Sequence, residues 1–220
     1  MTSFSLLICI VSHDSGELVT RTATMAGAAG GTVVMGRNIA SNGLLQALAI
    51  GDTSKDIVYI LVSTEEKESV IRAVVTASEE NRKICGILFA INAAYFIKTG
   101  IITGGDNDMA QKMTHQMITV IANKGYADDI MAAARKAGAG GGTVINARGT
   151  ARPGDAKFFG MEIVPEKEML VILVDAEKTL AVLNAVKTLS CLEKPGSGIA
   201  FCCPAGDFTV LGARKQGEKK

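Results

Sequence analysis

The sequence predicts an α+β fold in which one βαββαβ unit occurs twice. Three observations predict it: two similar glycine-rich stretches, apolar runs that recur at a near-constant spacing, and the order of the elements between them. Residues 26–37 read AGAAGGTVVMGR, and residues 137–148 read AGAGGGTVINAR. The two stretches lie 111 residues apart in a chain of 220. Because only two copies occur, the repeat indicates a tandem duplication and not a solenoid.

The apolar runs support the same alignment. Residues 118–121 align with residues 7–10 at the spacing of 111, and after one added residue 170–174 align with 58–62. Each half is long enough to bury a core of its own. We therefore expect one domain at residues 1–98, a glycine-containing linker at 99–114 and a second domain at 115–220.

The first strand and helix of each unit can be placed from local signals. Residues 4–11 form a continuous apolar run that ends at a polar turn, which is typical of a buried strand. We expect a helix at residues 16–25, because the equivalent segment begins with two aspartates and ends with Arg135 and Lys136. Those charges complement a helix dipole. Gly138 then fits a left-handed cap at the helix end.

The remaining strands and the second helix of each unit can also be placed from local signals. Short strands should be followed by a long loop, a β-branched strand, a helix and a last strand. Thr64 and Asp175 are the expected N-caps of the second helices. The expected strands lie at residues 32–35, 57–62, 87–91, 143–146, 169–174 and 199–203. This order predicts two ferredoxin-like domains, each a four-stranded antiparallel sheet with two helices on one face.

Composition excludes several classes of partner. The chain is 48% apolar and 20% charged with a formal net charge of +1, so it is globular, with no electrostatic case for nucleic acid. No apolar run reaches the roughly 18 residues of a membrane helix. The first apolar run lacks a preceding Lys or Arg and recurs inside the chain, so we interpret it as a strand and not as a signal peptide.

The reactive side chains predict neither a metal site nor a catalytic site. The chain has five cysteines without metal-ligand spacing, most of them in apolar runs, which indicates reduced, buried thiols and a cytoplasmic protein. Its two histidines, His13 and His115, have no Cys or Glu at ligand spacing. No Ser or Cys has a partnered base. We therefore expect a protein that is not an enzyme.

The direction of the glycine-rich stretch decides how it is interpreted. Phosphate-binding loops run from a strand through glycines into a helix, whose N-terminus then faces the anion. Here the expected order is helix, glycines, strand. Helix capping and close packing are therefore favoured over a Walker or Rossmann loop.

The second half resembles the P-II nitrogen regulatory protein family. The motifs that carry the resemblance are GTVINARG at residues 142–149, VPEK at 164–167 and GSG at 196–198. The resemblance covers most of the second half and the first half only in outline. It implies a ferredoxin-like homo-oligomer without catalysis, a trimer or alternatively a dimer. It also implies an adenine nucleotide or 2-oxoglutarate as regulatory ligand, with no cofactor assigned.

The resemblance also implies which residues bind the ligand. They are Gly140, Gly141, Gly142, Thr143, Arg148, Gly149, Lys167, Gly196, Ser197 and Gly198. The loop at residues 150–164 would dock on a regulated protein through Arg152, Lys157, Phe158 and Phe159. The departures from the family pattern include Glu166 and Ile199, which replace lysines, and the arginines expected beyond the last strand, which are missing at their usual spacing.

The resulting hypothesis is a small-molecule-responsive regulator that binds its ligand in an inter-domain cleft and controls a partner through the loop at 150–164. The regulated partner is not identified by the sequence. The alternative hypothesis is a small enzyme on the same duplicated fold, with its active site between the halves. Fold alone does not decide between them, because function belongs to the site.

Overall fold

The computed structural model describes residues 4–39, 53–93, 95–98, 101–104, 113–149, 157–158, 161–162, 166–193 and 198–212. It confirms the expected mixture of helices and strands. Contacts divide the chain into two compact units, the first of residues 1–35, 54–115 and 204–220 and the second of 36–53 and 116–203. The domain boundaries expected from the sequence therefore stay a prediction, since two strands, β2 (Thr32–Asn38) and β12 (Gly198–Leu211), each supply residues to both units.

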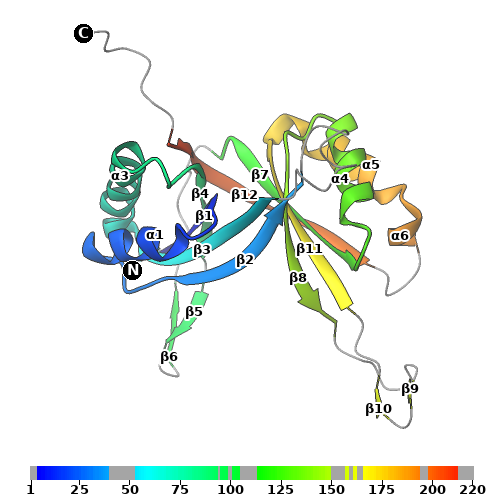
Figure 1. Ribbon diagram of the computed structural model, residues 1–220, viewed down its shortest axis with the longest axis horizontal. Helices are drawn as coiled ribbons and strands as arrows, with labels where there is room; N and C mark the ends of the chain where they lie inside the picture. Colours follow the sequence, from blue (N-terminus) through cyan, green and yellow to red (C-terminus); the bar gives the residue numbers. More distant parts are fainter. Residues whose placement is uncertain are drawn as a thin grey trace. The chain divides into compact units, whose positions relative to one another are not determined.

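The first unit contains the βαββαβ order expected for the first repeat. Its strands follow one another across the sheet as β2, β3, β1, β4 and the end of β12. Helices α1 and α3 pack against each other (Figure 1). The elements are β1 (Phe4–Ser12), α1 (Gly16–Met25), β2 (Thr32–Asn38), β3 (Thr53–Ser63), α3 (Thr64–Glu80), β4 (Gly86–Ala93) and β12 (Gly198–Leu211).

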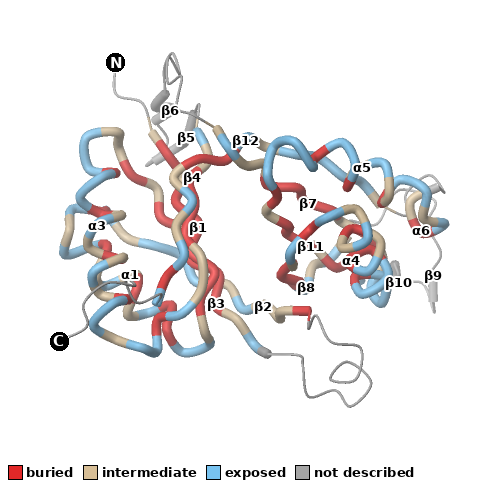
Figure 2. The backbone as a smooth tube through the Cα atoms, turned by 90° about the horizontal axis from the view of Figure 1, so that it is seen from above, coloured by how far each residue is buried: buried red, intermediate tan, exposed pale blue. Residues whose placement is uncertain are grey.

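The central strands of this unit are buried, as their apolar runs predict. In β1, Leu7, Cys9 and Val11 are fully buried, and they share one face of the strand because alternate residues point the same way. Antiparallel pairing sets Leu7 opposite Ile60 and Cys9 opposite Val58, which join the same core. Figure 2 shows this burial along β1. Burial raises the pKa of the Cys9 thiol to about 12, so this cysteine is a packing residue.

The second unit repeats the order with different lengths. Its strands lie in the order β2, β8, β11, β7 and β12, and α4 packs against α5. The elements are β7 (His115–Asn123), α4 (Ala127–Lys136), β8 (Thr143–Arg148), β11 (Glu166–Asp175), the 3-10 helix η1 (Ala176–Lys178), α5 (Thr179–Lys187) and α6 (Ser190–Glu193). Ile118, Met131 and Ile172 are buried in its core.

Two short hairpins interrupt segments that were expected to be loop or linker. Strand β5 (Tyr95–Lys98) pairs with β6 (Ile101–Gly104), which lies inside the predicted linker. Strand β9 (Lys157–Phe158) pairs with β10 (Met161–Glu162) inside the long loop of the second half. Both pairings are short, which explains why period-2 patterns did not reveal them.

The first helix of each repeat ends in the same backbone motif. The N–H of Ala28 donates to the carbonyl of Ala23 at 3.0 Å, and the N–H of Ala139 donates to that of Ala134 at 3.0 Å. The glycine between has a φ of 118° at Gly27 and 102° at Gly138, a conformation that glycine adopts without strain. The prediction of Gly138 as a left-handed cap is confirmed.

Of the two predicted N-caps of the second helices, Thr64 is wrong and Asp175 is confirmed in position. The cap of α3 is Ser63, whose hydroxyl accepts the N–H of Glu66 in a capping box, one residue before the expected Thr64. Asp175 occupies the N-cap position of η1 but makes no side-chain cap bond, and its carboxylate accepts Lys178 Nζ at 2.6 Å. Cysteine burial is also only partly as expected: Cys9 and Cys191 are buried, but Cys85 and Cys202 are exposed.

A buried ion pair joins α3 to the end of β12 within the first unit. The side chain of Lys67 is 4% exposed, and its Nζ donates to Asp207 Oδ2 at 2.8 Å. Asp207 itself has a φ of 51°, next to an irregularity in the pairing of β12 with β4. Asp207 therefore compensates a cation that is otherwise shielded from water.

We expect Asp207→Asn to lower stability by about 3 to 5 kcal/mol, because it leaves the Lys67 ammonium buried without its counter-charge. Combining it with Lys67→Met should recover most of that loss. Thermal unfolding followed by circular dichroism measures both. Breaking the exposed Lys178–Asp175 pair by Asp175→Asn is the control and should change the midpoint little. Equal destabilisation of the single and double variants would contradict the assignment.

Candidate functional site

A buried carboxylate holds the turn before the first helix in both repeats. Asp56 Oδ2 accepts the N–H of Gly16 at 2.9 Å. Glu168 Oε2 accepts the N–H of Gly125 at 2.9 Å and of Ala127 at 3.3 Å. Asp56 and Glu168 are only 5% and 6% exposed. The sequence reasoning missed them, although an acidic residue recurs at the second spacing, 112 residues, just before each apolar strand.

The two carboxylates have different second partners. His13 Nδ1 lies 2.9 Å from Asp56 Oδ1, and this hydrogen bond, followed by the charge of Asp14, raises the His13 pKa. Arg37 Nη2 lies 3.4 Å from Glu168 Oε1 within the second unit. The His13 imidazole and the Arg37 guanidinium therefore each contact a buried carboxylate. Stabilising that carboxylate is a structural role that accounts for both side chains.

The His13 pairing predicts a pH dependence of stability. The folded-state pKa lies above the ordinary value of about 6.5, so the stabilisation is complete below that value and is lost as pH rises through the folded pKa. We expect the unfolding midpoint to fall over that window and the His13→Gln variant to lose the slope. Asp14→Asn should reduce the slope only in part. A midpoint that rises with pH in the wild type would exclude this assignment.

A cavity of about 360 Å³ lies in the second unit where β8 ends and β11 begins. Antiparallel pairing sets Arg148 opposite Glu166 and Ala147 opposite Lys167, so the two strand ends bring their side chains together. The lining residues are Lys124, Asn146, Ala147, Arg148, Glu166 and Lys167.

The electrostatics of this cavity favour an anion. Lys124 Nζ donates to Glu166 Oε2 at 2.7 Å, which lowers the Glu166 pKa and raises the Lys124 pKa. Lys167 Nζ donates to Asn123 Oδ1 at 2.6 Å. Among the described residues, three basic side chains and one carboxylate thus line the cavity. Guanidinium and ammonium groups in this arrangement recognise carboxylates or phosphates.

The structure brings together only part of the predicted ligand site. Arg148 and Lys167 line the cavity, whereas Lys124 and Asn146 were not predicted. Thr143 is 4% exposed and forms part of the packed interior. Gly196, Ser197, Arg152 and Phe159 lie outside the described residues, as do the side chains of Lys157 and Phe158 in β9. Gly149 follows β8 and is half-buried.

The glycines of the predicted site differ in their surroundings. A Cβ added at Gly142 would lie 2.9 Å from Leu170 Cδ1 and 2.9 Å from Met131 Sδ. At Gly198 it would lie 2.6 Å from the Ile121 carbonyl oxygen. No atom of the residues that the structure describes lies within 4 Å of a Cβ built at Gly140 or Gly141. Close packing therefore explains why positions 142 and 198 are glycine. No contact among the described residues requires glycine at positions 140 and 141.

We expect Gly142→Ala to destabilise the fold by about 1 to 3 kcal/mol through overpacking. Gly140→Ala and Gly141→Ala are matched neighbours, and each should leave the unfolding midpoint close to that of the wild type. Chemical denaturation of the three variants measures the difference. If all three lose the same stability, close packing is not the reason for glycine at position 142.

Neither a metal centre nor a membrane helix occurs in the part of the chain that the structure describes. There, no three His, Cys, Asp or Glu side chains are grouped so that they could hold a metal ion. No helix within the same residues combines the length and the apolar character that crossing a bilayer requires.

Comparison with known families gives a match to the second half of the chain. Residues 115–215 match the sequence profile of the family described as nitrogen regulatory protein P-II. The matched segment contains Arg148, Lys167 and the loop between β8 and β11. The resemblance expected from the motifs is confirmed for this half, which is a divergent P-II-like segment, and the match supports a regulatory role. Comparison with curated proteins gave no match.

Solved structures resemble the chain only distantly. A protein of Thermus thermophilus named as a PII-like signaling protein is 18% identical over 44% of this chain and 88% of its own, with a TM-score of 0.31. An unknown protein from Galdieria sulphuraria is 12% identical over 92% and 98%, with a TM-score of 0.28. A protein named as a glycine cleavage system transcriptional repressor is 10% identical over 96% and 99%, at 0.26. These scores are too low to support an inference about function.

Proposed function

We propose that this protein is a small-molecule-responsive regulator whose second half binds an anionic metabolite in the cavity lined by Arg148, Lys167 and Lys124. The observation that carries the proposal is the place of this cavity. It lies where β8 ends and β11 begins, so its residues flank both ends of the loop at 150–164. A ligand there would act on the loop without touching its tip.

Ligand binding would be coupled to the conformation of the loop at 150–164, because the two cations belong to the two strands that flank it. Arg148 is the last residue of β8, and Lys167 is the second residue of β11. An anion that contacts both would favour the arrangement in which the two ends of the loop are held together. A ligand shifts a conformational equilibrium only through such a difference in affinity between states. The loop would then present or withdraw its docking residues, Arg152, Lys157, Phe158 and Phe159.

The chemistry of the cavity indicates the ligand class. A volume of about 360 Å³ accommodates a small dicarboxylate or the phosphates of a nucleotide. Arg148 offers a planar fork for either anion, and the two lysines offer point charges. The family match makes 2-oxoglutarate and adenine nucleotides the first compounds to test. We propose that the predicted Gly140, Gly141, Gly149, Gly196 and Ser197 line the approach.

We also propose that the chain consists of two tandem ferredoxin-like domains, at residues 1–98 and 115–220. The strand orders β4-β1-β3-β2 and β12-β7-β11-β8 support this, since both have the same order relative to the sequence. Self-assembly of such chains into a trimer, or alternatively a dimer, would complete the ligand site. Native mass spectrometry distinguishes the two states.

Isothermal titration of the full chain with 2-oxoglutarate, ATP, ADP and bicarbonate tests the proposal. We expect saturable binding without consumption of the ligand, and we expect Arg148→Ala or Lys167→Ala to weaken it at least about tenfold through loss of a charge-assisted contact. Lys55→Ala, at the equivalent position of the first repeat, is the matched control and should bind as the wild type does.

Two outcomes would overturn the proposal. Wild-type affinity in both cavity variants would move the ligand elsewhere. Consumption of a titrated ligand would instead favour the alternative hypothesis of a small enzyme. A separate readout follows the loop: bound ligand should slow amide exchange at residues 150–164, and unchanged exchange at full occupancy would remove the loop from the mechanism.

A further inference from the structure

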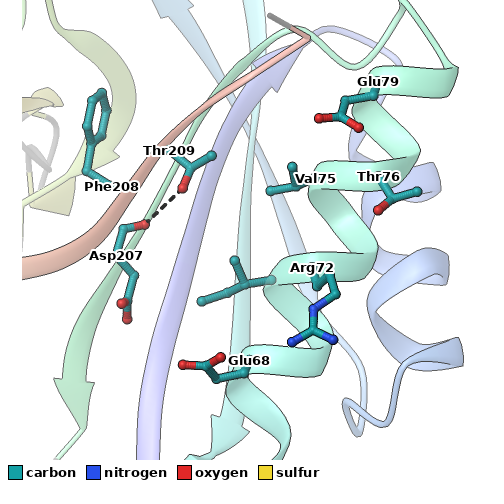
Figure 3. Close-up of a pocket in the computed structure, with 9 residues that line it drawn as sticks. Glu68, Arg72, Val75, Thr76, Glu79, Asp207, Phe208 and Thr209 are labelled. Carbon is teal, nitrogen blue, oxygen red and sulfur yellow. Dashed lines mark hydrogen bonds between the residues drawn. The ribbon is translucent and has the colours of Figure 1, made fainter. Parts of the chain in front are cut away.

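We propose that the first unit carries a docking groove for a basic segment of a partner protein, between helix α3 and the end of strand β12. This α3–β12 groove is a cavity of about 450 Å³. It is lined by one face of α3 from Glu68 to Glu79 and by residues 207–209 of β12 (Figure 3). It is separate from the proposed metabolite site in residues and in unit, so neither proposal depends on the other.

Helical spacing produces one wall of the groove. The lining residues of α3 follow one another three and four positions apart, which places them on one stripe of the helix. From Glu68 to Glu79, a span of twelve residues and eleven helical steps, this stripe is about 16 Å long. Ile71 and Val75 lie within it and are half-buried, so the stripe has an apolar centre. Three turns of a partner helix, or a short extended peptide, would match that length.

The opposite wall is held in a defined position. Asp207 lies in the left-handed region and binds the buried Lys67 of α3, which fixes this part of β12 against the helix. The ring of Phe208 points away from α3 in Figure 3 and lies against His115, with ring centroids 4.7 Å apart. The groove is therefore a preformed feature, and little ordering cost opposes a ligand.

The charge of α3 identifies the kind of partner. Its exposed glutamates outnumber its single exposed arginine, Arg72, and its lysine, Lys67, is buried and paired. The exposed glutamates are Glu65, Glu66, Glu68, Glu79 and Glu80. Among the described residues, Glu68, Arg72 and Glu79 form no ion pair.

The charges that line the groove and form no ion pair among the described residues, Glu68 and Glu79 against Arg72, leave a net negative rim around an apolar centre. Such a rim complements a segment with lysines or arginines on one side and aliphatic residues on the other. In helix-in-groove recognition, apolar anchor residues usually supply the contact area, and charged residues set the binding register and raise the association rate. The whole chain has a formal net charge of +1, so the acidity is a local property of this helix. A patch of this size fits a transient interaction.

The test titrates the full chain with a fluorescein-labelled amphipathic peptide of about 14 residues, carrying a leucine stripe and a lysine-arginine face. The comparison peptide has glutamate at each basic position. We expect the basic peptide to bind and the acidic one not to bind. Affinity should fall as salt rises from about 0.05 M to about 0.3 M, because the contacts are solvent-exposed.

The decisive variants lie on neighbouring residues. Glu79→Lys changes a lining residue, and Glu80→Lys makes the same charge change at the next position, outside the groove. Glu79→Lys combined with Glu68→Lys should weaken binding at least about tenfold, whereas Glu80→Lys combined with Glu65→Lys, an equal charge change outside the groove, should weaken it less than about twofold. Val75→Thr, which keeps the shape of the residue, should weaken binding about threefold to tenfold. Circular dichroism checks that each variant is folded.

Three outcomes would overturn the proposal. Equal losses in the Glu79 and Glu80 variants would mean that the peptide responds to net charge and not to the groove. Much tighter binding after removal of residues 213–220, which carry Arg214, Lys215, Lys219 and Lys220, would make the chain's own tail the occupant. Self-association that Glu68→Lys and Glu79→Lys abolish, without peptide binding, would make the occupant a second copy.

Discussion

A carboxylate buried at the start of the third strand is the constraint on which each repeat depends. It accepts backbone N–H groups at the turn where the first helix begins, so the direction of that helix relative to the sheet is set by a polar contact inside an apolar environment. Asp56 and Glu168 perform this at equivalent positions. A buried carboxylate left without donors would be costly, and this makes the turn, the helix and the strand a single cooperative feature.

Much of the fold could be predicted because its signals are local and occur twice. The bounds of α1 match those expected, and β1, β3 and β11 extend the expected strands by a few residues. Gly138 was identifiable as a cap because a left-handed helix end is a property of a few neighbouring residues. The predictions that failed concerned elements whose pairing partners are distant in the sequence. β12 extends eight residues beyond the expected Cys203, where its end pairs with β4, and no periodic pattern marks that pairing.

The candidate site was predictable to the extent that motifs marked it. Arg148 and Lys167 were found through the resemblance, and strand pairing brings them to one cavity. Lys124 and Asn146 were missed, because Lys124 comes from the turn after β7 and only the folded sheet places it there. Thr143 and Gly142, which the resemblance also assigns to the ligand, have burial and close contacts typical of core residues.

Arg37 and Arg148 occupy corresponding positions of the two repeats, yet their surroundings differ. The guanidinium of Arg37 lies against the buried Glu168, whereas that of Arg148 borders the cavity. A protein with one repeat would have a single arginine here, which could not neutralise an interior acid and remain available to a metabolite. Two copies divide these tasks. Substitutions at position 148 can therefore change the chemistry of the cavity while Arg37 still neutralises the buried Glu168.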